Sequence, residues 1–229
     1  MKDAGYTTHV YMATCSVCAP EMADTVTATL SINGKVTETD RYSVMAYANE
    51  IIANKDGKFS ETLITLVKTM LNYGAATQVQ FADEHPNTVF ANEGVNYDLA
   101  ALSSAELSAL NSPKPVKETL DSKLSGSGLT YYGYTMLLYS KTTLRFYFLK
   151  ESPTTDISKL SIGGVAAKNY NDYFAYVEVS NIASKNLSNA YTISYDGTSL
   201  GSYSPMTYVQ DVLQNSPEDT TLCNTVTAM

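Results

Sequence analysis

The stretch from Tyr42 to Phe81, YSVMAYANEIIANKDGKFSETLITLVKTMLNYGAATQVQF, predicts two helices joined by a glycine-containing turn. Ser43 and Ser60 are the expected N-caps, because each precedes apolar residues that recur at helical spacing. Gly57 lies in the turn, since glycine tolerates the left-handed backbone in which helices end. Each helix carries an apolar stripe that needs a packing partner. We therefore expect a helical hairpin.

A shorter version of the same pattern returns at the C-terminus, in YSPMTYVQDVLQNSPEDTTLCNTVTAM over residues 203–229. In the first helix the matching residues are Tyr42, Ser43, Met45 and Tyr47 with Tyr203, Ser204, Met206 and Tyr208. In the second helix they are Leu63, Val67 and Met70 with Leu222, Val226 and Met229. Upstream they are Thr29, Ser31 and Gly34 with Thr192, Ser194 and Gly197. Duplication over tens of residues indicates two copies of one structural unit.

Composition restricts the classes of protein to which the chain can belong. Its 229 residues are 44% hydrophobic, which is typical of a globular protein with a substantial core. A net charge of −8 argues against nucleic acid or an anionic membrane as the partner. No apolar run reaches the roughly 20 residues that span a bilayer, so membrane insertion is not expected. The 18 tyrosines and the absence of tryptophan are typical of secreted β-rich proteins and adaptable binding surfaces.

Strand patterns surround the two helical hairpins. Asn33-Gly34 and Asp196-Gly197 are strong hairpin-turn signals between β-branched segments. The segment LTYYGYTMLLYSKTTLRFYFLK predicts a β-hairpin that turns near Ser140, with Leu144, Phe146 and Phe148 on one face and Arg145 and Tyr147 on the other. The predicted fold class is α+β, with two related modules, each an antiparallel β-sandwich with a helical hairpin.

Domain boundaries follow from composition. The first module is predicted over residues 1–112, where strands precede the helical hairpin 42–82 and a loop with a short helix. Prolines and the run Ser125-Gly126-Ser127-Gly128 indicate a linker over 113–128. The second module is predicted over 129–229, with a β-sandwich at 129–202 and a truncated helical hairpin at 203–229. We expect a monomeric fragment of a longer chain.

Five sequence segments of this chain resemble a duplicated module of very large extracellular proteins from Gram-positive gut anaerobes. The similarity is carried by YSVMAYANEII, LVKTMLNYGAATQVQF, NTVFANEGV, LTYYGYTMLLYSKTTLRFYF and YVEVSNIASKNLSNAYTISYDG, which together cover more than half of the chain. The resemblance implies secretion and display on the bacterial cell surface. Some similar surface proteins are immunoglobulin-binding and superantigen-like, which makes immunoglobulin the candidate host partner. No family motif marks binding residues that could be transferred to this chain.

The cysteines and histidines offer little material for a metal site or a catalyst. Cys15 and Cys18 have the spacing of a redox pair or half of a zinc site, but a zinc site needs a second pair of ligands. Buried or strand-edge thiols are the more ordinary interpretation of these two residues, and Cys223, His9 and His85 are the remaining candidate ligands. His9 and His85 are expected to be surface residues. We therefore predict no enzyme, no metal and no cofactor.

The tyrosines are the most informative polar feature. Alternation along the predicted hairpin places Tyr131, Tyr139 and Tyr147 away from the phenylalanine face, beside Arg145. Tyrosine is enriched in strands, so ordinary sheet packing is one interpretation. The other is a protein-binding face, because tyrosine supplies a large contact area at low entropic cost. We predict non-catalytic binding of a host protein through these four residues, with carbohydrate or cell-wall binding and a structural spacer as alternatives.

Overall fold

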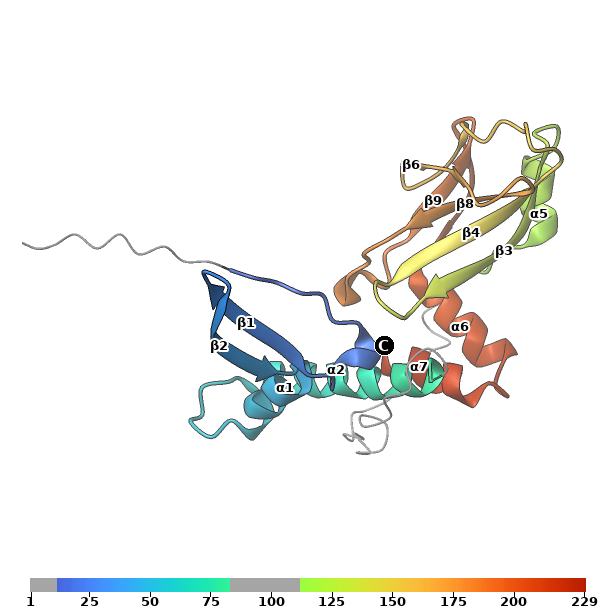
Figure 1. Cartoon of the computed structure of the whole chain (residues 1–229). Coiled ribbons are helices and arrows are strands. Elements are labelled where there is room, and N and C mark those ends of the chain that lie inside the picture. Colours follow the sequence, from blue (N-terminus) through green and yellow to red (C-terminus); the bar gives the residue numbers. More distant parts are fainter. Residues whose placement is uncertain (1–11, 83–111) are drawn as a thin grey trace, which may run out of the picture.

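The computed structural model describes residues 12–82 and 112–229. The predicted short helix of the first module, His9 and His85 lie outside these ranges. Every strand pair in the described ranges is antiparallel, and the helices occupy separate segments of the chain, so the fold class is α+β. Figure 1 shows a projecting hairpin and two helices at one end and two sheets at the other.

The described part of the first half contains a short 3-10 helix, one β-hairpin and two helices. Asn33 and Gly34 both have positive φ (51° and 74°), the geometry of a two-residue turn that matches the twist of the flanking strands. The elements are η1 (Ala19–Glu21), β1 (Val26–Ile32), β2 (Lys35–Tyr42), α1 (Val44–Ala53) and α2 (Glu61–Gln80). Within the described residues, this half contains a two-stranded sheet.

The helical hairpin predicted from the opening stretch is confirmed. The Ser43 hydroxyl accepts a hydrogen bond from the backbone N–H of Ala46, and the Ser60 hydroxyl accepts one from Leu63. Asn54 ends α1 in the left-handed conformation. The facing stripes of the two helices bury a small core of Ala48, Ile51, Ile64, Val67 and Leu71.

The second half contains two four-stranded sheets that share one core. Their orders are β10-β9-β5-β6 and β3-β4-β8-β7. The elements are β3 (Leu129–Leu137), β4 (Thr143–Lys150), β5 (Leu160–Ile162), β6 (Val165–Ala166), β7 (Lys168–Asn169), β8 (Phe174–Val179), η2 (Ser184–Asn186), β9 (Tyr191–Tyr195) and β10 (Thr198–Tyr203). We call these sheets, together with the helix α5 (Lys117–Lys123), the two-sheet body. Its fully buried side chains include Leu144, Phe146, Phe148, Leu160, Ile162, Val177 and Ile193.

The segment 113–128, predicted to be a linker, contains the helix α5 (Lys117–Lys123). Leu120 and Leu124 are each 1% exposed and belong to the core of the two-sheet body. Asp121 accepts a hydrogen bond from the backbone N–H of Tyr131, which fixes α5 against β3. The flanking prolines and glycines gave no sign of this helix, which the apolar pair Leu120 and Leu124, one helical turn apart, anchors to the core.

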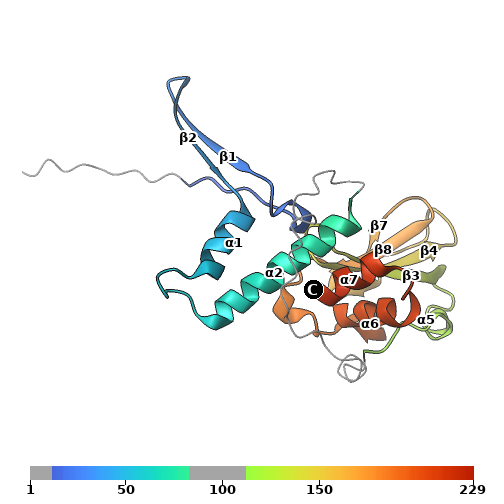
Figure 2. The same cartoon turned by 90° about the horizontal axis from the view of Figure 1, so that it is seen from below.

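The second helical hairpin joins the two halves. It consists of α6 (Pro205–Asn215) and α7 (Thr220–Ala228), and α7 packs beside α2 in Figure 2. The hydroxyl of Thr225 donates to the carbonyl of Ala76 at 3.2 Å, and the hydroxyl of Thr221 donates to Oε1 of Gln80 at 2.6 Å. Met136 and Leu138 at the end of β3 pack with α6 and α7 in a third apolar cluster.

Among the residues described, no helix is both long enough and apolar enough to cross a bilayer.

Candidate binding surface

The outer face of the sheet β3-β4-β8-β7, opposite its buried face, gathers aromatic rings around a charged cluster. The register brings them together: Arg145 pairs directly with Glu178, Tyr147 with Tyr176, and Lys168 with Tyr176. We call this surface the outer aromatic face. Its residues are Tyr132, Arg145, Tyr147, Lys168, Tyr170, Phe174, Tyr176 and Glu178.

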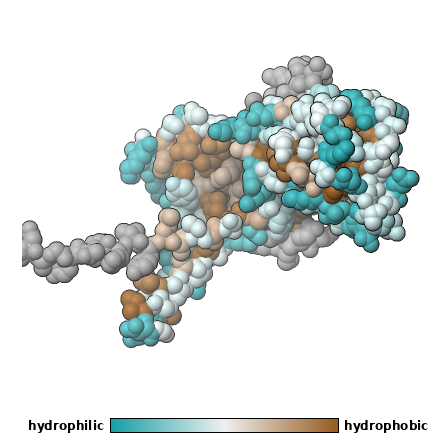
Figure 3. Space-filling model, turned by 90° about the horizontal axis from the view of Figure 1, so that it is seen from above, coloured by the Kyte–Doolittle hydropathy of each residue, from teal (hydrophilic) through white to brown (hydrophobic). Residues whose placement is uncertain are grey.

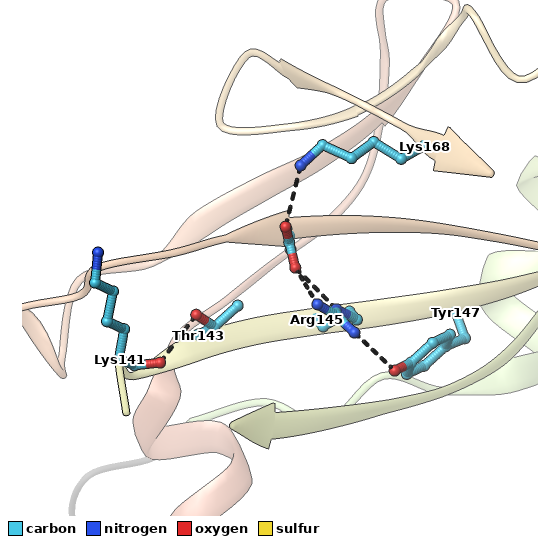
Figure 4. Close-up of polar contacts among 6 residues, drawn as sticks. Lys141, Thr143, Arg145, Tyr147 and Lys168 are labelled. Atoms are coloured by element: carbon cyan, nitrogen blue, oxygen red, sulfur yellow. Dashed lines mark hydrogen bonds and ion pairs between the residues drawn. The ribbon is translucent and has the colours of Figure 1, made fainter. Parts of the chain in front are cut away.

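A charged cluster links three strands, β4, β8 and β7, in the middle of this face. Arg145 donates from Nε and from Nη2 to the same oxygen of Glu178, at 2.8 and 2.6 Å, and from Nη1 to the Tyr147 hydroxyl at 3.3 Å. Lys168 donates to the other Glu178 oxygen at 3.2 Å. Figure 4 shows Arg145 and Lys168 reaching this carboxylate from two different strands. Charge-assisted bonds of this kind are about twice as strong as neutral ones.

The ionisation of Glu178 follows from its neighbours. Burial raises the pKa of this carboxyl, but hydrogen bonds from Arg145 and Lys168 outweigh burial and hold the pKa below its ordinary value of 4.5. Glu178 is therefore charged at neutral pH. Two cations then face one carboxylate, which leaves a local excess of one positive charge on a protein whose net charge is −8.

The rings meet largely edge to face. The Arg145 guanidinium lies 4.5 Å from the centre of the Tyr176 ring, and Tyr170 meets the rings of Tyr147 and Tyr176 at 88° and 81°. Tyr132 meets Phe174 at 82°, with centroids 5.0 Å apart. Edge-to-face pairs stabilise by about 0.5–1.5 kcal/mol beyond the area they bury. The rings are therefore positioned before any partner arrives.

A shallow pocket of about 220 Å³ opens between these rings. Gly133 stands directly opposite Tyr147 in the sheet, so the residue of β3 that pairs with Tyr147 has no side chain to cover its ring. Tyr132 and Tyr170 remain 62% exposed at its rim. The pocket is lined by Tyr132, Tyr147, Tyr170, Asn171 and Phe174. A second hollow, of about 680 Å³, lies at the α5 end of the two-sheet body and is lined mainly by loop residues and small side chains. The smaller pocket is the one that combines rings with a polar amide.

Two of the four predicted binding residues, Arg145 and Tyr147, come together on the outer aromatic face. The other two do not join them. Tyr139 is half-buried beyond the end of β3, where its ring meets Phe81 edge to face at 5.4 Å. It therefore lies at the junction of the two halves.

The prediction that Tyr131 faces away from the phenylalanines is wrong. Tyr131 pairs directly with Phe148, is 5% exposed and packs in the core. The register shifts between Tyr131 and Gly133, so Tyr132 is the extra residue of a β-bulge. A bulge breaks simple alternation, which is why Tyr131 and Tyr134 both point inward while Tyr132 points out.

Residues that sequence reasoning missed complete the face. Tyr170, Phe174 and Tyr176 come from the segment YNDYFAYVEV, whose alternation was visible but whose partner strand was not. Once β8 is paired with β4, Tyr176 falls opposite Tyr147 and Glu178 opposite Arg145. Lys168 enters through a two-residue strand that is too short for a sequence pattern to reveal.

The cysteines are free thiols in the structure. Cys18 precedes η1 and its backbone N–H donates to Glu21 at 2.8 Å, while burial, followed by the Glu21 charge, raises the pKa of the thiol. In the described ranges, no three His, Cys, Asp or Glu side chains gather closely enough to hold a metal ion.

No protein-family model matches this chain, and neither a curated protein nor a solved structure matches it.

Proposed function

We propose that this chain is a non-catalytic binding module of a bacterial surface protein, and that it binds a host protein through the outer aromatic face. The observation that supports the proposal is the group of preordered, partly exposed rings around the Arg145–Glu178 pair. Tyrosine and arginine are the residue types that most often dominate the energy of protein interfaces.

The geometry favours a protein partner on energetic grounds. Tyr132 and Tyr170 each offer a large apolar area whose position is already restricted by a neighbouring ring, so binding costs little side-chain entropy. The charged pair lies below the rings, with the Arg145 and Glu178 side chains 19% and 12% exposed. A partner that covers the rings therefore does not have to break this pair.

The resemblance to duplicated modules of extracellular proteins supports the rest of the proposal. It supports a location at the bacterial cell surface or in the secreted fraction, and it makes immunoglobulin the first partner to test. We also propose that the two halves are copies of one module that combines a β-sandwich with a helical hairpin. The local excess of positive charge favours an acidic patch on the partner.

Carbohydrate binding is the second candidate, because one observation favours it. The pocket between the rings includes the amide of Asn171, and an amide beside aromatic rings can hydrogen-bond sugar hydroxyls while a ring supports the sugar's apolar face. A spacer role, the third alternative from sequence, requires no binding at this face.

The test measures binding of purified polyclonal Fab and of a glycan array to the full chain and to two variants. Tyr170→Ala removes a ring of the outer aromatic face, whereas Tyr47→Ala removes a tyrosine of α1 that is 54% exposed and lies outside it. Fab binding that is lost only in Tyr170→Ala supports the proposal. Glycan binding that is lost only in Tyr170→Ala supports carbohydrate binding instead. Absence of binding in both assays contradicts both the protein-binding and the carbohydrate-binding proposals.

A further inference from the structure

The β1–β2 hairpin and the β9–β10 hairpin are built in the same way. Asp196 and Gly197 have φ of 48° and 76°, close to the values at Asn33 and Gly34. In both hairpins the register then shifts at the same distance from the turn: Thr37 is the extra residue in β2 and Leu200 the extra residue in β10, each three positions after the turn glycine. The same turn with the same bulge fixes the same pairing.

The likeness extends to both sides of the hairpins. A 3-10 helix precedes each of them, η1 in the first half and η2 in the second, and two helices follow each. The backbone N–H of Met45 donates to the carbonyl of Met22 at 2.8 Å, and that of Met206 donates to the carbonyl of Leu187 at 3.2 Å. Each bond joins the first turn of the following helix to the end of the 3-10 helix.

The surroundings of the two hairpins differ. In the second half β9 pairs with β5, and Ile193 is fully buried between the two sheets. Leu30, its counterpart by distance from the turn, is 54% exposed. Every residue of β1 and β2 is exposed, and in the described part of the chain no strand pairs with the outer edge of β1.

The exposed hairpin nevertheless has the pattern of a strand with one buried face. The sequence of β1, VTATLSI, alternates strictly between apolar and polar residues, so one face carries Val26, Ala28, Leu30 and Ile32. Figure 3 shows apolar residues on the hairpin where it projects from the molecule. β1 has neither a charge nor a proline, although natural proteins use these to protect an edge strand that stays open.

We propose that β1–β2 is a docking hairpin, which completes the β-sheet body of a partner. The strands of this partner are arranged like β3–β8, and it lacks a hairpin equivalent to β9–β10. The free edge of β1 pairs with a strand equivalent to β5, and Leu30 enters the core where Ile193 lies in the second half. The partner's chemistry is therefore an open antiparallel sheet edge next to an uncovered apolar core.

A second copy of this chain does not offer such a site. Its β5 is already paired with its own β9, and Leu160 and Ile162 are fully buried by that hairpin and the facing sheet. The β9–β10 hairpin thus shows what covers such a face. An identical molecule cannot supply the open sheet edge, because its own β9–β10 hairpin already occupies that edge. The proposal is independent of the outer aromatic face.

The experiment extends the chain at its N-terminus. A second copy of residues 113–179 replaces residues 1–14 and is joined to Cys15, the counterpart of Ser180, which follows β8. Amide hydrogen exchange is then measured on the extended and original chains. We expect the β1 amides to exchange quickly in the original chain and as slowly as the β9 amides of the same molecule in the extended one.

Two variants of the extended chain test the mode of docking. Leu30→Asp places a charge on the apolar face and should abolish the new protection of β1. Val36→Asp is the matched control, because Val36 is 57% exposed and pairs with Ser31 on the opposite face. It should retain the protection.

Three results overturn the proposal. One is β1 exchange that the extension leaves unchanged, whether or not the added segment folds. Another is equal loss of protection in Leu30→Asp and Val36→Asp. The third is protection of β1 in the original chain that rises with protein concentration, which would make a second copy the occupant.

Discussion

Arg145 on β4 lies directly opposite Glu178 on β8, and two guanidinium nitrogens, Nε and Nη2, donate to the same carboxylate oxygen at 2.8 and 2.6 Å. The pair is mostly buried beneath exposed rings. A binding face requires side chains that are held in position, and this pair helps to hold the rings above it in place. A sheet face that contacts only solvent has no such requirement.

Removing the arginine should destabilise the protein. In Arg145→Ala, Glu178 keeps only the Lys168 contact while remaining mostly buried, so we expect a loss of about 1.5–3 kcal/mol in the free energy of unfolding. Lys168→Ala is the control, because the Lys168 side chain is 55% exposed, and it should cost less than about 1 kcal/mol. Urea denaturation measures both values, and equal losses would contradict the assigned roles.

Acid should weaken the fold through Glu178. Its pKa is lower in the folded protein than its ordinary value of 4.5, so its contribution is present above that value and is lost as pH falls through the folded pKa. We therefore expect the unfolding free energy of the native protein to fall more steeply with acid than that of Glu178→Gln. Denaturation series at several pH values below 5 decide this, and parallel curves would refute it.

The helix α5 should behave as part of the core. Leu120→Ala deletes a side chain that is 1% exposed in the two-sheet body, and such deletions cost about 2–5 kcal/mol. Val116→Ala, at a position 51% exposed, serves as the matched control and should change stability by less than about 0.5 kcal/mol. If both variants unfold like the native chain, residues 113–128 act as a linker after all.

The contact between the halves makes a spectroscopic prediction. The Tyr73 hydroxyl on α2 donates to the carbonyl of Leu138 at 2.8 Å, and burial raises the pKa of Tyr73 to about 12. Tyr73→Phe should cost about 1 kcal/mol. In an absorbance titration it should remove one tyrosine that ionises well above pH 10. If the variant instead loses a tyrosine that titrates near pH 10, Tyr73 is exposed to solvent and the assigned contact is wrong.

Local patterns predicted the elements that they encode directly. Ser43 and Ser60 act as helix caps, and Asn33-Gly34 forms the turn of the first hairpin, because each of these effects depends on a few neighbouring residues. The alternation of Leu144, Phe146 and Phe148 against Arg145 and Tyr147 likewise gave the buried and outer faces of β4 correctly.

The pairing of strands that are distant in the sequence could not be predicted from local patterns. The bulge at Tyr132 reversed the expected side of Tyr131, and a bulge leaves no mark in a pattern of alternating residues. The partnership of Tyr147 with Tyr176 depends on which strand lies beside β4. The repeated sequence pattern was readable, yet the difference between an exposed β1 and a buried β9 follows from the presence of β5 and not from either hairpin.

The most direct measurement is the binding of purified Fab to the immobilised full chain, compared among the native protein, Tyr170→Ala and Tyr47→Ala. We expect the native chain and Tyr47→Ala to bind alike, and Tyr170→Ala to raise the Kd at least about tenfold, a change of about 1.4 kcal/mol. Equal binding by all three proteins, or no binding by the native chain, would contradict the claim that the outer aromatic face binds immunoglobulin.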